Sequence, residues 1–175
     1  MIVAKQVADM ITLARALLVL CLVWLGLAQG PRGLALAAWL MIADWAGDLV
    51  DGRIARRSRI RYRTWIGDHD LEVDMAVSIG LLFFLLRAGF VNIWVAWGYV
   101  LLSGVYFWRQ GRIPHSTGML FQAPIYGWFI WVALRDAPQA GWAIVIYIGA
   151  LIALTWPYFP KVVVPGFLHG LRKHS

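Results

Sequence analysis

Seven of the nine acidic residues of this chain lie within residues 44–74, and the rest of the chain is almost free of carboxylates. Within that stretch Asp48 and Asp51 are three residues apart, and Asp70 and Asp74 are four apart. Side chains at these spacings lie on one face of an α-helix, so each pair directs two carboxylates the same way. Because carboxylates are costly at membrane depth, a chain that keeps them in apolar segments generally uses them for its function.

A group of carboxylates this dense would repel itself unless its members were protonated or bound cations. Oxygen-rich sites suit hard divalent ions such as Mg²⁺, Mn²⁺ or Ca²⁺. Cys21 is the only cysteine, which excludes a cysteine-rich metal site. Two ions that share carboxylates would hold a phosphate or diphosphate and stabilise displacement at phosphorus. The cluster therefore predicts a divalent-metal site for a phosphorylated substrate.

Small residues and an arginine follow the first pair of carboxylates. Gly52 and Ala55 leave room beside Asp51 for a ligand, and Arg56 offers a forked donor for phosphate. Taken alone, the two small residues equally indicate close packing between membrane helices. Their place directly after the paired carboxylates favours the ligand-binding interpretation. Asp44, one turn earlier, adds a carboxylate to the same helix face.

The composition places these residues in a membrane protein. Of the 175 residues, 61% are hydrophobic, and the mean hydropathy is +0.69, whereas soluble domains are roughly 45–50% apolar. Since a span needs about 20 mostly apolar residues, the chain can hold about six spans as one domain, residues 1–175. We predict an all-α polytopic fold with spans at residues 8–29, 34–55, 71–90, 92–108, 118–135 and 140–159. We also expect residues 1–8 to form a short interfacial helix.

The second and third predicted spans carry the two pairs of carboxylates. A short connection joins these spans, so we expect antiparallel neighbours whose ends meet and bring four or five carboxylates into one pocket. Arginines crowd that connection at residues 53–63, whereas the loops of the opposite side hold only three basic residues, Arg32, Arg87 and Arg135. By the positive-inside rule both termini and the active site lie at the cytoplasmic face, and a bacterial inner membrane is the location that we expect.

The net charge of +7 is therefore mainly a signal of topology. The arginine-rich residues 53–63 form only a short connection between two spans, which argues against nucleic-acid binding. Attraction to anionic lipid headgroups explains these arginines better.

The order of these residues resembles the signature of the CDP-alcohol phosphotransferases, D-x2-D-G-x2-A-R, about eight residues, then G-x3-D-x3-D. Residues 48–56, DLVDGRIAR, match the first half at every fixed position. In the second half Asp70 and Asp74 keep the family spacing, but two residues rather than three separate Gly67 from Asp70. Thirteen residues separate Arg56 from Asp70, one more than usual.

A further resemblance lies upstream. Thr12 and Arg15 stand as in the T-x-x-R often found in the first span of this family. Two other readings of Arg15 remain open: it snorkels to the cytoplasmic interface, or it pairs with Asp9 or Asp44. We keep Thr12, Arg15 and Asp44 as additional candidate site residues.

The resemblance implies an enzyme that transfers a substituted phosphate from a CDP-linked lipid to a small alcohol in phospholipid biosynthesis, with release of CMP. We expect CDP-diacylglycerol as the donor. The resemblance also implies Mg²⁺ or Mn²⁺ as cofactor, with two ions, and a homodimer. The implied metal ligands are Asp48, Asp51, Asp70 and Asp74, and Asp74 is also the implied catalytic base. The residues implied to contact the nucleotide are Gly52, Ala55, Arg56 and Gly67.

Other functions also fit parts of the pattern. The altered spacing around Gly67 would suit a degenerate family member that binds nucleotide without turnover. Carboxylates in spans also suit a divalent-cation or proton transporter. A transporter does not account for Gly52, Ala55 and Arg56 at their spacing, and it would place acidic residues in the last three spans, which hold almost none. The acceptor is left open among glycerol 3-phosphate, inositol phosphate, serine and other alcohols.

Overall fold

The structure is a computed structural model that describes residues 2–57, 70–111, 115–157, 161 and 165. These residues form six long helices and one short 3₁₀ turn, which confirms the predicted all-α fold. The elements are α1 (Ile2–Ala28), η1 (Gly30–Gly33), α2 (Leu34–Arg57), α4 (Asp70–Arg87), α5 (Ile93–Gln110), α6 (His115–Asp136) and α7 (Pro138–Leu154). Each long helix coincides with one predicted span, with shifts of a few residues at the ends. Residues 2–8 are the first turns of α1, continuous with the rest of that helix, and their interfacial location stays a prediction.

Residues typical of turns and helix caps lie at several of the helix ends. Gly30 has a φ of +54° and is the first residue of the 3₁₀ turn that leads into α2. Asn92 caps α5, because its side chain accepts a hydrogen bond of 2.9 Å from the Trp94 backbone N–H. Gly111 ends the same helix in the left-handed conformation, at a φ of +66°. Pro138 lies in the first turn of α7, where its missing N–H does no harm.

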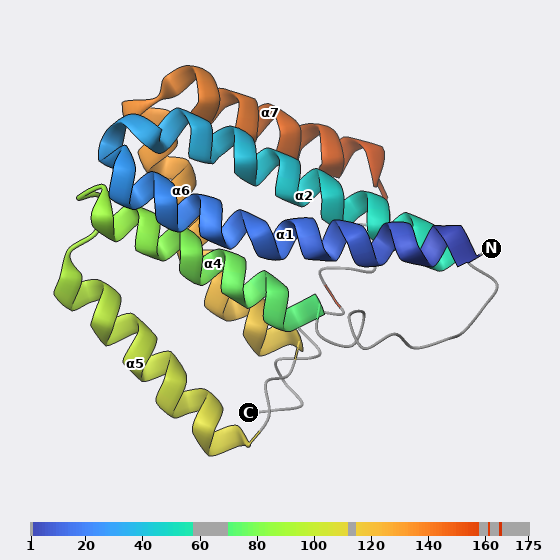
Figure 1. Ribbon diagram of the computed structural model, residues 1–175, viewed down its shortest axis with the longest axis horizontal. Helices are drawn as coiled ribbons and strands as arrows, with labels where there is room; N and C mark the ends of the chain where they lie inside the picture. Colours follow the sequence, from blue (N-terminus) through green and yellow to red (C-terminus); the bar gives the residue numbers. More distant parts are fainter. Residues whose placement is uncertain (1, 58–69, 112–114, 158–160, 162–164, 166–175) are drawn as a thin grey trace.

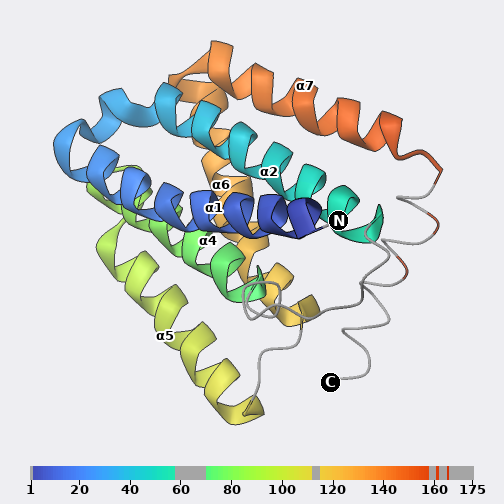
Figure 2. The same ribbon diagram turned by 45° about the vertical axis from the view of Figure 1, so that its right-hand side comes forward.

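The helices form a bundle in which α1 lies between α2 and α4, as Figures 1 and 2 show. Helix α1 contacts α2 on one side and α4 on the other, α7 covers the far side of α2, and α6 crosses behind them against α4 and α7. Helix α5 lies at the edge of the bundle beside α4. Small residues bring α1 and α4 close, since a β-carbon on Gly26 would lie 3.2 Å from Phe84 Cα.

Apolar side chains fill the inside of the bundle and also cover its outside. Leu22, Leu81 and Phe129 are fully buried between the helices. On the outer surface, by contrast, Leu20 is 64% exposed and Leu102 is 75% exposed. A surface this apolar is unusual for a soluble monomer and suits contact with lipid.

One helical segment in the described part of the chain, Ser116–Asp136, is both long and apolar enough to cross a membrane by length and composition. Leu13–Ala28 and Pro138–Leu154 are apolar but shorter. The charged residues of α2, and the acidic residues at the start of α4, lower the hydropathy of those two helices. The six-span topology therefore stays a prediction.

The chain alternates between two ends of the bundle. We call the site end the one where α2 ends and α4 and α6 begin, and the far end the one that holds η1 and the α4–α5 and α6–α7 connections (Figure 1). Helices α2 and α4 run antiparallel, and the end of α2 and the start of α4 lie at the site end, on either side of α1. They do not pack along each other as expected, however, because α1 packs against both.

Candidate active site

Arg15 joins the two acidic helices at the centre of the bundle. Its Nε donates a hydrogen bond of 2.9 Å to Asp44 Oδ1 of α2, and its Nη2 donates to Asp74 Oδ1 of α4. The side chains of Arg15 and Asp44 are 6% and 1% exposed, and that of Asp74 is 21% exposed. Of the interpretations left open for Arg15, the geometry shows the pairing with Asp44, and Asp74 is a second partner that the sequence did not indicate.

We call these three charged side chains, Arg15, Asp44 and Asp74, the Arg15 cluster. A buried guanidinium is stable only when paired carboxylates compensate its charge and accept its hydrogen bonds. Arg15 has this arrangement, since carboxylates from two other helices accept its hydrogen bonds. Asp74, the least buried of the three, is the member best placed to meet a ligand from the site end.

The other predicted ligands lie on the same two helices. Asp48 and Asp51 are on α2, one and about two turns beyond Asp44 toward the site end, and Asp70 is the first residue of α4, one turn before Asp74. The structure describes these three by their backbone only. Among the side chains that it does describe, no three acidic, histidine or cysteine groups form a metal site. The donor set that the sequence provides, all carboxylate oxygens, suits Mg²⁺ or Mn²⁺.

The predicted nucleotide-binding residues lie around the end of α2. The backbone of Gly52, Ala55 and Arg56 belongs to the last turns of that helix, at the site end. Thr12 lies on α1 one turn before Arg15, and it too is described by its backbone only. Gly67 lies outside the described residues. The roles predicted for all of these residues stay predictions.

Helix α6 borders the site along a stripe that the sequence analysis missed. Gly118, Gln122 and Tyr126 are spaced four apart and share one face of α6. Gly118 packs against Leu71 of α4, since a β-carbon at this glycine would lie 2.8 Å from Leu71 Cδ1. Tyr126 packs edge-on against Trp45 of α2, with ring centroids 5.6 Å apart.

Gln122 stands between these two contacts. Its side chain is buried, with the residue 8% exposed. In the part of the chain that the structure describes, the Gln122 Nε2 donates no hydrogen bond. The sequence signal that could have found it is a glutamine within the apolar segment predicted at residues 118–135.

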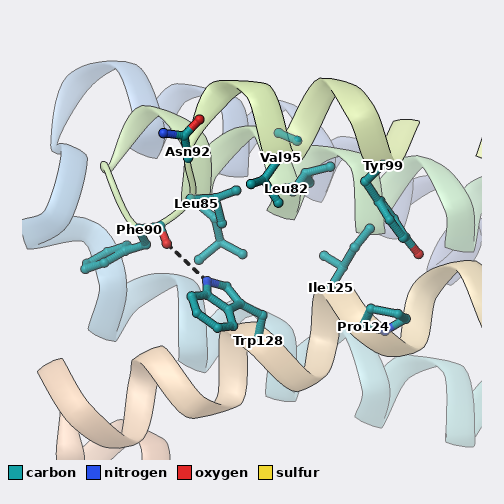
Figure 3. A pocket seen from close by; sticks show the side chains of 11 residues that line it. Leu82, Leu85, Phe90, Asn92, Val95, Tyr99, Pro124, Ile125 and Trp128 are labelled. Atoms are coloured by element: carbon teal, nitrogen blue, oxygen red, sulfur yellow. Dashed lines mark hydrogen bonds between the residues drawn. The ribbon is translucent and has the colours of Figure 1, made fainter. Parts of the chain in front are cut away.

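A separate apolar pocket of about 390 Å³ lies between α4, α5 and α6 (Figure 3). Leu85 of α4, Val95 of α5 and Ile125 of α6 line it, and Trp128 closes one side by donating a hydrogen bond of 3.1 Å to the Phe90 carbonyl. None of its lining residues belongs to the predicted site. The pocket therefore does not extend the Arg15 cluster.

Comparison with known proteins identifies the family. The family model of the CDP-alcohol phosphatidyltransferases matches residues 5–156, which span α1 to α7 and include the whole acidic stretch. No curated protein and no solved structure matches the chain. Because the family match covers most of the chain, the protein belongs to the CDP-alcohol phosphatidyltransferase family.

Proposed function

We propose that this member of the CDP-alcohol phosphatidyltransferase family transfers the phosphatidyl group of CDP-diacylglycerol to a small alcohol and releases CMP. The family establishes the general reaction, the transfer of a phosphatidyl group from a CDP-alcohol. CDP-diacylglycerol, the metal requirement and the residue roles are our proposals. The observation that supports them most is that Arg15 draws Asp44 of α2 and Asp74 of α4 together.

The proposed reaction is a displacement at the phosphorus that carries diacylglycerol. The hydroxyl oxygen of the acceptor attacks this phosphorus and forms a new phosphorus–oxygen bond. The bond from the same phosphorus to the oxygen shared with CMP breaks, and CMP leaves with the electron pair. Asp74 accepts the proton of the attacking hydroxyl, because an alcohol is a weak nucleophile at neutral pH without a base.

The remaining residues bind and orient the substrates. Arg15 fixes the Asp74 carboxylate through its hydrogen bond to Oδ1, and a fixed base is more effective than a mobile one. Gly52, Ala55 and Arg56 are proposed to bind the cytidine nucleotide at the end of α2. Asp48, Asp51, Asp70 and Asp74 are proposed to hold two Mg²⁺ or Mn²⁺ ions. Such ions, when bound, neutralise the charge that develops on the leaving nucleotide.

We further propose that the site end faces the cytoplasm of a bacterial cell, from an inner-membrane location. The exposed apolar side chains on the outer surface of α1, α5 and α7 support contact with lipid. The basic residues of the far end are few, and one of them is neutralised, because Arg135 Nη2 lies 2.6 Å from Asp136 Oδ2. The arginine-rich segment at residues 53–63, which leads out of α2, supports a cytoplasmic site end.

Release of CMP tests this proposal. The purified protein in detergent is given CDP-diacylglycerol with Mg²⁺ or Mn²⁺ and a panel of acceptors that includes glycerol 3-phosphate, inositol phosphate and serine. We expect CMP release with one acceptor, its loss in EDTA and its recovery when the metal is restored. CMP release that is unaffected by EDTA would contradict the metal proposal.

The Asp74→Asn variant tests the assigned base in the same assay. An asparagine keeps an oxygen that can accept from Arg15, so the fold should be retained, while it cannot take up the proton. We expect CMP release to fall by about 10²-fold or more. Full activity in this variant would overturn the base assignment. A wild-type protein that binds the nucleotide and releases no CMP with any acceptor would instead be a degenerate member, and one that neither binds nor reacts would restore the transporter hypothesis.

A further inference from the structure

Gln122 has a feature that packing alone does not explain. A buried amide donor without a hydrogen bond destabilises the folded protein, because its N–H groups lose water and gain no partner. Gln122 Nε2 is such a donor, within a helix whose other inward-facing side chains are mostly apolar. An apolar side chain of the same length would fill this position without that destabilisation. Unpaired buried polar groups are rare in native proteins and need an explanation, and a bound ligand that accepts the hydrogen bond is one.

The contacts on either side of Gln122 place it next to the proposed active site. One turn before it, Gly118 meets Leu71, which stands between Asp70 and Asp74 on α4. One turn after it, Tyr126 meets Trp45, which directly follows Asp44 on α2. The face of α6 that carries Gln122 is therefore turned toward the site-end halves of α2 and α4.

The hydrogen-bonding capacity of the Gln122 side chain indicates which kind of ligand it would bind. In the described part of the chain no acceptor of α2 or α4 reaches the Gln122 amide, and an amide NH₂ contributes two donors. The phosphoryl oxygens of a substrate are the acceptors that such a donor would find when the site is filled. A hydrogen bond to a charged phosphoryl oxygen is stronger than one to a neutral group.

We propose that Gln122 is a substrate-binding residue whose side-chain amide donates to a phosphoryl oxygen in the active site. This inference rests on the proposed function for the identity of the site. The phosphoryl oxygen belongs either to CDP-diacylglycerol or to a phosphorylated acceptor, and both sources offer the same chemistry to the amide. No motif of the sequence analysis includes this residue.

The Gln122→Met variant tests the proposal, because methionine has a similar length and no N–H group. We expect kcat/KM for CMP release to fall about ten- to hundredfold, as for the loss of a hydrogen bond to a charged group. A rise in KM for CDP-diacylglycerol assigns the contact to the donor lipid, and a rise in KM for the acceptor assigns it to a phosphorylated acceptor. The melting temperature of the ligand-free variant should stay the same or rise by a few degrees, since an unpaired buried donor has been removed.

The matched control is Gln139→Met. Gln139 is exposed in the first turn of α7 at the far end, so this change should alter neither the melting temperature nor the activity. A lower melting temperature for Gln122→Met would overturn the proposal, because it would show that the amide has a structural partner. An unchanged kcat/KM would overturn it as well.

Binding separates this inference from the proposed function. If the wild-type protein releases no CMP, the proposed function fails, and the inference is then tested by the rise in melting temperature that CDP-diacylglycerol and Mg²⁺ produce. A rise in the wild type that is reduced in Gln122→Met would support a role for Gln122 in binding. An equal rise in both proteins, or none in either, would overturn it.

Discussion

At the scale of single residues, the Arg15 cluster links stability to the proposed chemistry. Arg15 and Asp44 are almost completely buried, whereas Asp74 is partly exposed. A buried ion pair contributes little net stability, but the loss of one carboxylate leaves a buried N–H group of the guanidinium without its acceptor. Asp44 therefore has a structural role that is separate from the proposed role of Asp74, since its carboxylate keeps Arg15 in place beside the base.

Replacement of Asp44 should consequently destabilise the protein. We expect Asp44→Ala to lower the free energy of unfolding by about 1–3 kcal/mol, because the buried Arg15 Nε loses its acceptor while Asp74 still pairs with Nη2. The control is Asp136→Ala, which removes the partner of Arg135 in a pair whose side chains are 54% and 34% exposed. Exposed pairs contribute little, so this variant should melt almost as the wild type does. Thermal unfolding in detergent measures both, and equal melting temperatures would show that Asp44 does not compensate a buried charge.

At the scale of helices, small residues set how closely neighbours approach. Among the described glycines, Gly141 makes the closest contact between helices, here between α6 and α7. A β-carbon on Gly141 would lie 2.5 Å from the Leu134 backbone nitrogen and 2.6 Å from Leu134 Cα. Only Ala137 separates the two helices in the sequence. The short connection and the glycine together hold the start of α7 against the end of α6, and α7 in turn packs against α2.

A methyl group at this contact should force the two helices apart. We expect Gly141→Ala to lower the free energy of unfolding by about 1–3 kcal/mol, as overpacking does elsewhere. Gly149→Ala on the same helix is the matched control, because a β-carbon there would meet nothing within 4 Å. Since alanine favours a helix interior over glycine by roughly 0.5–1 kcal/mol, this control should be as stable as the wild type or slightly more stable. Chemical or thermal unfolding of both variants measures the difference, and a stable Gly141→Ala protein would argue against the close contact.

At the scale of the whole molecule, the basic residues are distributed unequally between the two ends of the bundle. The connections at the far end carry Arg32 and Arg87 together with the paired Arg135, whereas the arginine-rich segment follows α2 at the site end. Apolar side chains cover the outer surface between the two ends. This distribution supports the proposed orientation, with the site end in the cytoplasm.

Labelling of single cysteines tests that orientation. With Cys21 replaced by serine, Gln139→Cys marks the far end, and Gln110→Cys marks the site end. A membrane-impermeant maleimide added to intact cells should label Gln139→Cys, and it should label Gln110→Cys only after the membrane is opened. The opposite pattern would place the site end outside the cytoplasm.

The sequence by itself determined the helices and the chemical type of the site. Hydropathy and helical periodicity are local properties, so they predicted all six helices in order. The two pairs of carboxylates, with Gly52, Ala55 and Arg56 after the first pair, resembled the signature of a family that the match over residues 5–156 confirms. The antiparallel course of the two acidic helices also followed from the sequence, because a short connection returns the chain from the end of α2 to the start of α4.

The tertiary structure decided which side chains from different helices meet. The partners of Arg15 are 29 and 59 residues away in the sequence, and no local pattern distinguishes such a pairing from snorkelling to the interface. The expectation that α2 and α4 are direct neighbours was wrong, because the close packing of α1 against both leaves Arg15 to connect them. Gln122 was missed for the same reason. Whether a polar residue in an apolar helix is exposed or buried without a partner depends on the helices packed around it, and only the assembled bundle contains that information.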